Sequence, residues 1–275
     1  LIDKYQISII SLVPTVARLL LEQIEATGAT CPSLRTMTAT GEAFPVALKE
    51  RLAAALPNVG LWVFYGMTEG GIPAALRPEE QTLKPTSVGR PMPGVEIRLM
   101  DEAGLQVETG QSGEVQLRSG APGRAMIARE YFNRPDANAE AYKGGWFRTG
   151  DVGRFDEDGY LHLVDRVKDM ILSGGLNVYS REVEQALETA PAVREVAVVA
   201  GADEEYGECV VAYVALKPGQ AATADELIAH CRDYIAGYKK PKYLFFLDDL
   251  PRNVNGKVVK ATLRESAAGD IAGAD

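Results

Sequence analysis

The sequence predicts a mixed fold of α/β and α+β type. A partial N-terminal α/β domain with a small β-rich subdomain is followed by a compact α+β C-terminal domain. Three observations predict this: strands and helices alternate in the first third, short strands punctuated by Gly and Pro fill residues 85–165, and a second helix-and-strand pattern closes the chain. At 275 residues the chain can hold more than one domain.

The first third supports a parallel sheet. We expect buried-type strands at residues 7–13, 34–40 and 60–66, an amphipathic helix over 15–25, and a second helix that Pro45 opens. Strands separated by helices indicate βαβ units. The β-rich subdomain follows and ends in "GRFDEDGYLHLVDR", whose Asp-Gly pair is typical of a hairpin turn.

We place a domain boundary in the charged segment near residue 167, which divides the chain into 1–167 and 168–275. In the second part, Thr223 and Glu226 form the pattern of a helix capping box. The tail "SAAGDIAGAD" at residues 266–275 is expected to be frayed. The other elements predicted here are helices over 181–190 and 223–235 and strands over 193–202, 209–219 and 242–250.

Composition excludes several classes of protein. A net charge of −9 argues against nucleic acid or an anionic membrane as the main partner. Three widely spaced cysteines indicate reduced thiols in a cytoplasmic protein, not a disulfide framework or a zinc site. No apolar run is long enough for a transmembrane segment. No GxxxxGK[ST] motif is present, which disfavours a P-loop ATPase.

The segment "VFYGMTEGG" (63–71) follows a predicted strand, where ligands bind in open α/β sheets. Tyr65 offers a flat face to a base, and Gly66 allows the backbone to approach a ligand. Thr68 offers a hydroxyl to a phosphate, and Glu69 is a hard oxygen ligand for Mg²⁺. The alternative is a glycine-rich loop with a capping Thr-Glu pair.

The segment "WFRTGD" places Asp151 after what we expect to be a tight Thr-Gly turn. It is either a surface loop or a carboxylate that binds a vicinal diol, such as that of ribose. The Gly41-Glu42 junction in "TATGEAFP" follows another strand and could line a purine edge, although most such junctions only cap a helix.

Two further segments lie in or next to the second domain. "DRVKDMILSGGLNV" places Arg166 and Lys168 at the boundary, followed by Gly174-Gly175. This pattern fits a charged hairpin edge or a hinge followed by a mobile turn that faces a ligand. Lys257 follows an Asn-Gly turn, and a lysine in this position is usually only solvated.

Taken in order, six segments resemble the signature segments of the adenylate-forming superfamily, which includes acyl- and aryl-CoA synthetases, luciferases and peptide-synthetase adenylation domains. The resemblance runs from about residue 5 to residue 265, and the family's Gly- and Ser/Thr-rich phosphate-binding loop has no counterpart. We therefore expect the C-terminal half of such an enzyme, inactive or incomplete alone. The segments are "TGE", "YGMTE", "SVGRP", "GWFRTGD", "DRVKDMI" with "SGGLNV", and "PRNVNGK".

The resemblance implies a role for each residue. Asp151 would accept both ribose hydroxyls, Tyr65 would stack on adenine beside Gly66, and Gly41-Glu42 would line the opposite side. Lys257 would bridge the substrate carboxylate and the α-phosphate. The other implied roles are α-phosphate contact for Thr68, Mg²⁺ binding for Glu69, ribose and phosphate contact for Arg166, a hinge at Lys168, and the pantetheine channel for Gly174-Gly175.

The implied activity is that of an ATP-dependent carboxylate–CoA ligase. An acyl-adenylate forms first, and the thiol of coenzyme A then displaces AMP while the C-terminal domain alternates as a lid. The implied ligands are ATP, AMP, Mg²⁺, coenzyme A and a small fatty or aromatic acid, and a homodimer is one conceivable assembly. The alternatives are an adenylation domain that loads a separate carrier protein and a non-catalytic nucleotide-binding remnant.

Two departures from the family pattern are visible. Ser180 replaces a frequent proline, a mild change at an expected helix N-cap, and Glu130-Tyr131 stands where the family has Gly-Tyr. We expect neither to touch the proposed nucleotide contacts.

Overall fold

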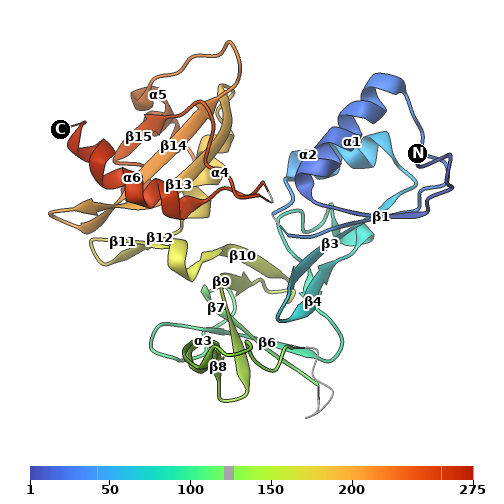
Figure 1. Ribbon diagram of the computed structural model, residues 1–275, viewed down its shortest axis with the longest axis horizontal. Helices are drawn as coiled ribbons and strands as arrows, with labels where there is room; N and C mark the ends of the chain where they lie inside the picture. The colour runs from blue at the N-terminus through green and yellow to red at the C-terminus, as the bar shows by residue number, and fades with distance from the viewer. Residues whose placement is uncertain (42, 121–126, 255, 275) are drawn as a thin grey trace. The chain divides into compact units, whose positions relative to one another are not determined.

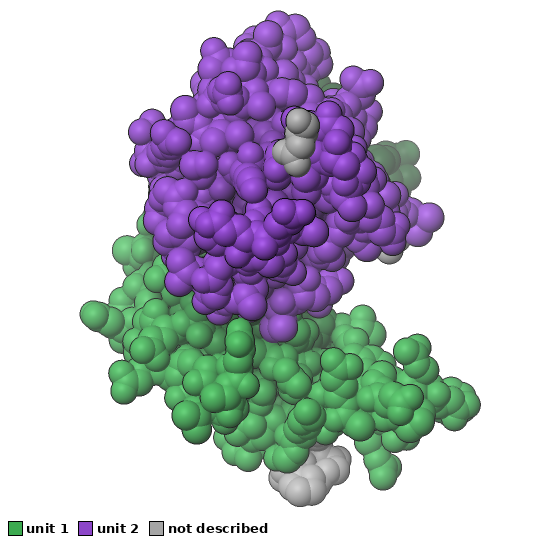
Figure 2. Space-filling model, turned by 90° about the vertical axis from the view of Figure 1, so that its left-hand side faces the viewer, with its two compact units in different colours: residues 1–163 green, residues 164–275 purple. Residues whose placement is uncertain are grey.

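The computed structural model describes residues 1–41, 43–120, 127–254 and 256–274. The chain forms two compact units, Leu1–Leu163 and Val164–Asp275 (Figure 2). The division by contacts falls four residues before the predicted boundary at 167/168 (168 − 164). The domain limits and the alternation of the two parts stay predictions.

The first unit begins with a five-stranded sheet in the order β1-β2-β3-β4-β5. Strands β1, β2 and β3 are parallel, which confirms the predicted βαβ units, and β4 and β5 extend the sheet in antiparallel pairing (Figure 1). Helices α1 and α2 pack against each other, and their buried Leu21 and Leu52 share one core with Met37 of β2. The elements are β1 (Ile9–Leu12), α1 (Pro14–Thr27), β2 (Thr36–Ala39), α2 (Val46–Ala55), β3 (Gly60–Met67), β4 (Gly71–Leu76), the 3₁₀ turn Pro78–Glu80 and β5 (Arg90–Pro91).

A second sheet completes this unit, in the order β10-β9-β7-β6 with β8 paired to β9. This is the predicted β-rich subdomain, and its core includes Val115, Leu117 and Leu161, all fully buried. A short helix that the sequence analysis did not expect, α3, precedes β8. The elements are β6 (Val95–Met100), β7 (Gly113–Ser119), α3 (Pro135–Ala141), β8 (Tyr142–Lys143), β9 (Trp146–Phe155) and β10 (Leu161–Arg166).

The second unit is an α+β sandwich around the long antiparallel hairpin of β13 and β14. Its sheet order is β12-β11-β14-β13, with β15 parallel to β14. The predicted capping box is confirmed: Thr223 Oγ1 accepts from Glu226 N–H, and the Glu226 carboxylate accepts from Thr223 N–H. The elements are 3₁₀ turns at Val167–Asp169 and Gly237–Lys239, β11 (Ile171–Ser173), β12 (Leu176–Val178), α4 (Ser180–Glu188), β13 (Val193–Asp203), β14 (Gly207–Leu216), α5 (Ala224–Cys231), β15 (Tyr243–Phe246) and α6 (Lys260–Ala272).

The prediction of a frayed tail is wrong. Residues 266–272 belong to α6, which buries Leu263 and Ala267 against the sheet. The Tyr213 hydroxyl of β14 also donates to the Asp270 carboxylate at 2.6 Å. Because most of these residues are small, the segment shows little hydrophobic periodicity from which a helix could be predicted. The helix is stabilised mainly by its packing on the sheet.

Candidate active site

The predicted Thr-Gly turn before Asp151 is wrong, because "WFRTGD" lies inside β9. A β-bulge interrupts the strand: Gln116 of β7 pairs with Arg148, whereas Glu114 pairs with Val152. Thr149 secures the bulge, since its hydroxyl donates to the Val115 carbonyl at 2.8 Å and accepts from Asp151 N–H at 3.0 Å. Bulges re-aim side chains, and this one directs the Asp151 carboxylate toward the first sheet.

That carboxylate meets Tyr65. The Tyr65 hydroxyl donates to Asp151 Oδ2 at 2.7 Å, and the ring is only 6% exposed. The structure thus brings together two residues that were predicted separately from segments 86 positions apart. A neutral hydroxyl orients the carboxylate and leaves its negative charge in place, so Asp151 remains suited to accept hydrogen bonds from a diol. Stacking of Tyr65 on adenine stays a prediction.

Gly66 has a structural reason to be glycine. A Cβ atom there would lie 2.8 Å from the Gly71 carbonyl oxygen of the paired strand β4. The register of β3 and β4 shifts at this point, between Tyr65 and Met67. Residues 68–70 then form the turn between the two strands, so Thr68 and Glu69 follow the end of a parallel strand, as predicted.

Glu69 is held by Tyr131, which was not among the predicted site residues. The Tyr131 hydroxyl donates to Glu69 Oε1 at 2.8 Å, and Ala128 N–H donates to the Glu69 carbonyl at 2.6 Å. Burial and the neighbouring Glu69 carboxylate raise the pKa of Tyr131 to about 12, so the hydroxyl keeps its proton. The expectation that Glu130-Tyr131 touches none of the proposed contacts is therefore wrong for Tyr131. The signal available in the sequence was that Tyr131 stands at the tyrosine of the family's Gly-Tyr pair.

The Gly41-Glu42 junction is only partly visible. Gly41 follows β2 with a φ of 93°, a conformation that glycine adopts without strain. Glu42 lies outside the described residues. The purine-lining role of this junction stays a prediction.

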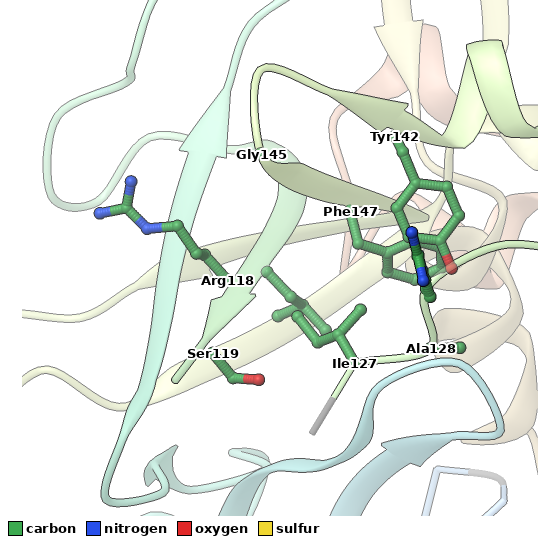
Figure 3. Close-up of a pocket in the computed structure, with 9 residues that line it drawn as sticks. Arg118, Ser119, Ile127, Ala128, Tyr142, Gly145 and Phe147 are labelled. Atoms are coloured by element: carbon green, nitrogen blue, oxygen red, sulfur yellow. The ribbon is translucent and has the colours of Figure 1, made fainter. Parts of the chain in front are cut away.

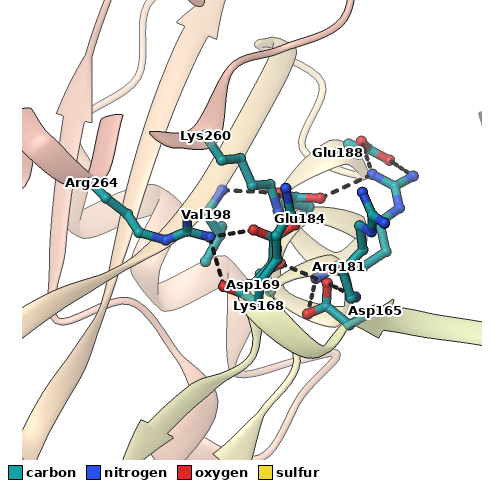
Figure 4. Close-up of polar contacts among 11 residues, drawn as sticks. Asp165, Lys168, Asp169, Arg181, Glu184, Glu188, Val198, Lys260 and Arg264 are labelled. Carbon is teal, nitrogen blue, oxygen red and sulfur yellow. Dashed lines mark hydrogen bonds and ion pairs between the residues drawn. The ribbon is translucent and has the colours of Figure 1, made fainter. Parts of the chain in front are cut away.

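In the second unit, a polar network joins the predicted hinge segment to two helices (Figure 4). Arg264 of α6 donates to the Lys168 carbonyl at 3.1 Å and pairs with the Asp169 carboxylate. Lys260, one turn earlier on α6, contacts Glu184 Oε1 at 2.6 Å and donates to Ser180 Oγ at 2.7 Å. The first turns of α6 and α4 are thereby tied together beside Lys168.

Ser180 is not the helix N-cap that was expected. It is the first residue of α4, fully buried, and its hydroxyl donates to Asp165 Oδ1 at 3.1 Å. Burial raises the pKa of Asp165, although the N–H of the following Arg166 donates to this carboxylate at 2.8 Å. Ser180 thus contacts Asp165, the residue before the predicted nucleotide-binding Arg166. The expectation that Ser180 touches none of the proposed nucleotide contacts stays a prediction.

Lys257 and the Gly174-Gly175 pair lie in two turns of the second unit. Asn253 organises the turn before α6: its N–H donates to the Lys257 carbonyl at 2.9 Å, and its Oδ1 accepts from Lys257 N–H at 3.0 Å. Gly174 and Gly175, with φ of 57° and 79°, form the two-residue turn between β11 and β12. Both positive φ values match a type I′ hairpin turn, which explains the glycines.

A cavity of about 490 Å³ opens on the second sheet of the first unit (Figure 3). None of the predicted site residues lines it. Among the described residues, no cluster of three His, Cys, Asp or Glu side chains is placed to hold a metal ion. A single carboxylate such as Glu69 fits Mg²⁺ that also binds substrate phosphates, since this ion needs few protein ligands. The lining residues are Leu117, Arg118, Ser119, Ile127, Ala128, Arg129, Tyr142, Gly145 and Phe147.

Comparison with known proteins establishes the family. The profile of AMP-binding enzymes matches residues 1–132, and that of the AMP-binding enzyme C-terminal domain matches residues 182–257. Together they match well over half of the chain. The chain therefore belongs to the AMP-binding enzymes, and the resemblance drawn from the six segments is confirmed.

Individual relatives agree. A long-chain-fatty-acid–CoA ligase of Yersinia pestis is 36% identical over 264 residues, covering 96% of this chain and 46% of the relative. The o-succinylbenzoate CoA synthetase of Bacillus subtilis, solved with its acyl-adenylate intermediate, superposes with a TM-score of 0.85 at 34% identity, covering 96% of this chain and 52% of that one. Its complex with ATP and a magnesium ion gives a TM-score of 0.83 at 34% identity, covering 97% and 52%.

The chain spans about half the length of the curated relatives it matches. In the described part of the chain, no helix is both long and apolar enough to cross a membrane.

Proposed function

We propose that this chain supplies the nucleotide-binding strand ends and the lid of an AMP-forming carboxylate–CoA ligase. The observation that carries the proposal is that two carboxylates near the C-terminal end of β3 each accept a hydrogen bond from a tyrosine hydroxyl: Asp151 from Tyr65 at 2.7 Å and Glu69 from Tyr131 at 2.8 Å. One is oriented for a vicinal diol and the other for a hard cation, which are the two features that distinguish Mg-ATP from most metabolites.

In the first half-reaction, a carboxylate oxygen of the acid attacks the α-phosphorus of ATP, and pyrophosphate leaves. Asp151 accepts the ribose hydroxyls, Tyr65 stacks on adenine, and the Gly41-Glu42 junction lines the opposite side of the base. Gly66 lets the backbone approach the nucleotide. Thr68 contacts the α-phosphate, and Mg²⁺ held by Glu69 would neutralise phosphate charge. Arg166 contacts ribose and phosphate.

The positively charged side chain of Lys257 lies near the reacting groups in this first step. A lysine between the acid and the α-phosphate offsets the repulsion of two anions and stabilises the charge of the transition state. Its turn leads directly into α6, where Arg264 donates to the Lys168 carbonyl and Lys260 donates to Ser180 at the start of α4. A rotation at Lys168 would therefore carry Lys257 as part of a rigid body.

In the second half-reaction, the sulfur of coenzyme A attacks the acyl carbonyl, its proton is lost, and AMP leaves. We propose that the part from residue 168 onward rotates about Lys168 between the two steps, so that the Gly174-Gly175 turn replaces Lys257 at the site. The acid is a fatty or an aromatic one, because the relatives named above activate one of each kind. A cytoplasmic location and a homodimer stay predictions.

The proposal is tested on the longest natural form of the protein. AMP release is measured with Mg-ATP and a panel of aliphatic and aromatic acids, with and without coenzyme A. Turnover that requires coenzyme A and yields thioester supports the ligase and identifies its acid. Bound adenylate with pyrophosphate but no thioester would favour a separate carrier protein as acceptor. No adenylate from any acid would contradict the ligase and favour a non-catalytic remnant.

A further inference from the structure

The hydrogen bond on Glu69 is one-sided. The Tyr131 hydroxyl occupies Oε1 at 2.8 Å, and among the described residues Oε2 has no hydrogen-bond partner. A carboxylate fixed through one oxygen cannot rotate freely, so the direction of the other oxygen is set as well. An outer donor of this kind commonly orients a metal ligand without touching the metal.

Tyr131 is itself held in place by Asn138 in the middle of α3. Tyr131 N–H donates to Asn138 Oδ1 at 2.7 Å, and Asn138 Nδ2 donates back to the Tyr131 carbonyl at 2.9 Å. This pair of bonds spans seven residues and closes the segment into a loop. In the same segment, the N–H of Ala128 donates to the Glu69 carbonyl at 2.6 Å. The segment therefore hydrogen-bonds to both the backbone and the side chain of Glu69.

The ring of Tyr131 is also positioned by contacts with other aromatic side chains. Its centroid lies 6.2 Å from that of Tyr142 in an edge-on contact, and Tyr142 in turn lies 5.1 Å from Phe147. Edge-on and tilted ring pairs of this spacing are favourable. The hydroxyl of Tyr142 is buried and has no hydrogen-bond partner among the described residues. Two neighbouring tyrosines therefore share the same aromatic cluster, and of the two it is Tyr131 that hydrogen-bonds to Glu69.

We propose that Tyr131, clamped by Asn138, is a positioning residue that aims Glu69 at the Mg²⁺ of Mg-ATP. This inference rests on the proposed function, because it takes Glu69 as the metal ligand. It adds α3 and the segment before it to the machinery of the first half-reaction, although neither touches the nucleotide in the proposed arrangement. Tyr131 matters to the step that uses Mg-ATP and not to the binding of AMP, which needs no metal.

The test uses the longest natural form of the protein and three variants: Tyr131→Phe, Asn138→Ala and, as the matched control, Tyr142→Phe. Calorimetry measures the affinity for ATP with Mg²⁺, for ATP with a chelator, and for AMP. Mg²⁺ increases the affinity for ATP by a factor that is measured for each variant. We expect this factor to be about tenfold smaller in Tyr131→Phe than in wild type, which is the lower end of the range for residues that hydrogen-bond to a metal ligand. Its AMP affinity should stay at the wild-type value.

Asn138→Ala should shift the same quantity in the same direction but less, since the hydroxyl of Tyr131 remains. Tyr142→Phe should change neither affinity. A Tyr131→Phe variant that gains as much from Mg²⁺ as wild type would overturn the proposal. Equal losses for Mg-ATP and AMP would also overturn it, because they would indicate a general disturbance of the fold.

The outcomes separate this inference from the proposed function. In one outcome, wild type binds Mg-ATP, Tyr131→Phe gains less ATP affinity from Mg²⁺, and no acid yields an adenylate. This outcome would contradict the ligase and support the positioning role. Wild type that makes thioester, with a Tyr131→Phe variant indistinguishable from it, would contradict the positioning role alone. Wild type that binds no Mg-ATP would contradict both.

Discussion

The carboxylates of the two units are stabilised in different ways. In the first unit, Glu69 and Asp151 each accept a hydrogen bond from a neutral tyrosine hydroxyl. In the second unit, Glu184 and Asp169 are each paired with a lysine or arginine of α6, and Glu184 Oε1 also accepts from Val198 N–H at 3.0 Å. A hydroxyl orients a carboxylate without cancelling its charge, as at Glu69, whereas the ion pairs of the second unit neutralise the charge.

This is the difference that we expect between carboxylates proposed to bind a ligand and structural carboxylates. A buried carboxylate whose charge is matched by a cation has little attraction left for Mg²⁺ or a polar ligand, and losing its partner is costly. A carboxylate oriented by a hydroxyl keeps its charge for a ligand that arrives later. The same contrast holds for cations: Lys260 has a carboxylate partner, while Lys49 of the first unit is buried against a carbonyl.

The largest expected effect is on Lys257, the cation of the second unit that we assign to the substrate. In the longest natural form, Lys257→Ala should raise the barrier to adenylate formation by about 3–4 kcal/mol, because the transition-state charge loses its counter-charge. Thioester formation from supplied acyl-adenylate should be spared. Single-turnover kinetics of both steps measures this, and equal impairment of the two would refute the assignment.

Next comes the charge-matched network. Lys260→Met removes one of the two cations that pair with Glu184, whose side chain is only 6% exposed; Arg181 Nη1 remains 3.3 Å from the other carboxylate oxygen. We expect the free energy of unfolding to fall by about 2 kcal/mol, less than for a buried charge left unpaired, because Arg181 stays in place and the Lys260 side chain is 19% exposed. Urea denaturation measures this loss.

The control for Lys260 is Arg51→Met. Arg51 pairs with Glu25 on the surface, with side chains 50% and 44% exposed. This variant should lose little or no stability, because exposed pairs contribute little. Similar losses in the two variants would contradict the distinction between buried and exposed pairs.

A smaller effect is expected at Lys49. Burial lowers its pKa from 10.5 to about 8, and its Nζ donates to the Pro85 carbonyl at 2.6 Å. Between pH 8 and 10.5 the unfolded chain binds more protons at this residue, so its contribution to stability increases with pH. Below about pH 8 the full cost of burying the charge remains.

Lys49→Met removes that cost but also removes the bond to Pro85. We expect a net gain of about 1–2 kcal/mol in unfolding free energy at pH 7 that shrinks as the pH rises toward 10.5. Urea denaturation across this pH range measures it, with the exposed Lys143→Met as control. A variant whose advantage stays constant with pH would show that Lys49 does not titrate as described.

The smallest effect is expected at the Tyr65 hydroxyl. Tyr65→Phe removes one hydrogen bond worth about 1 kcal/mol, so AMP affinity should fall about fivefold as Asp151 loses its orienting donor. Tyr160→Phe is a matched control: that ring is also 6% exposed, and its hydroxyl donates to the Glu80 carboxylate at 3.0 Å. Both variants should lose similar stability. Equal AMP affinities in the two would contradict the ribose role of Asp151.

Local patterns predicted the regular elements well. The strand and helix order from residue 7 to residue 66, the parallel pairing and the capping box at Thr223 all follow from periodicity and end signals. The bulge at Asp151 could not be predicted in this way, because it depends on the register with β7. Helix α6 was missed since its residues 266–272 are mostly small and gain their stability only by packing on the sheet.

The sequence by itself determined which chemical groups are available: one carboxylate after a glycine in "WFRTGD", another in "YGMTE", and a lysine after an Asn-Gly pair, in the order typical of AMP-binding enzymes. Only the tertiary structure decided which of these groups meet and what holds them. Tyr65 reaches Asp151 across 86 positions, and Tyr131 reaches Glu69 across 62. Such contacts depend on strand register and sheet packing, which are set by the whole fold and not by neighbouring residues.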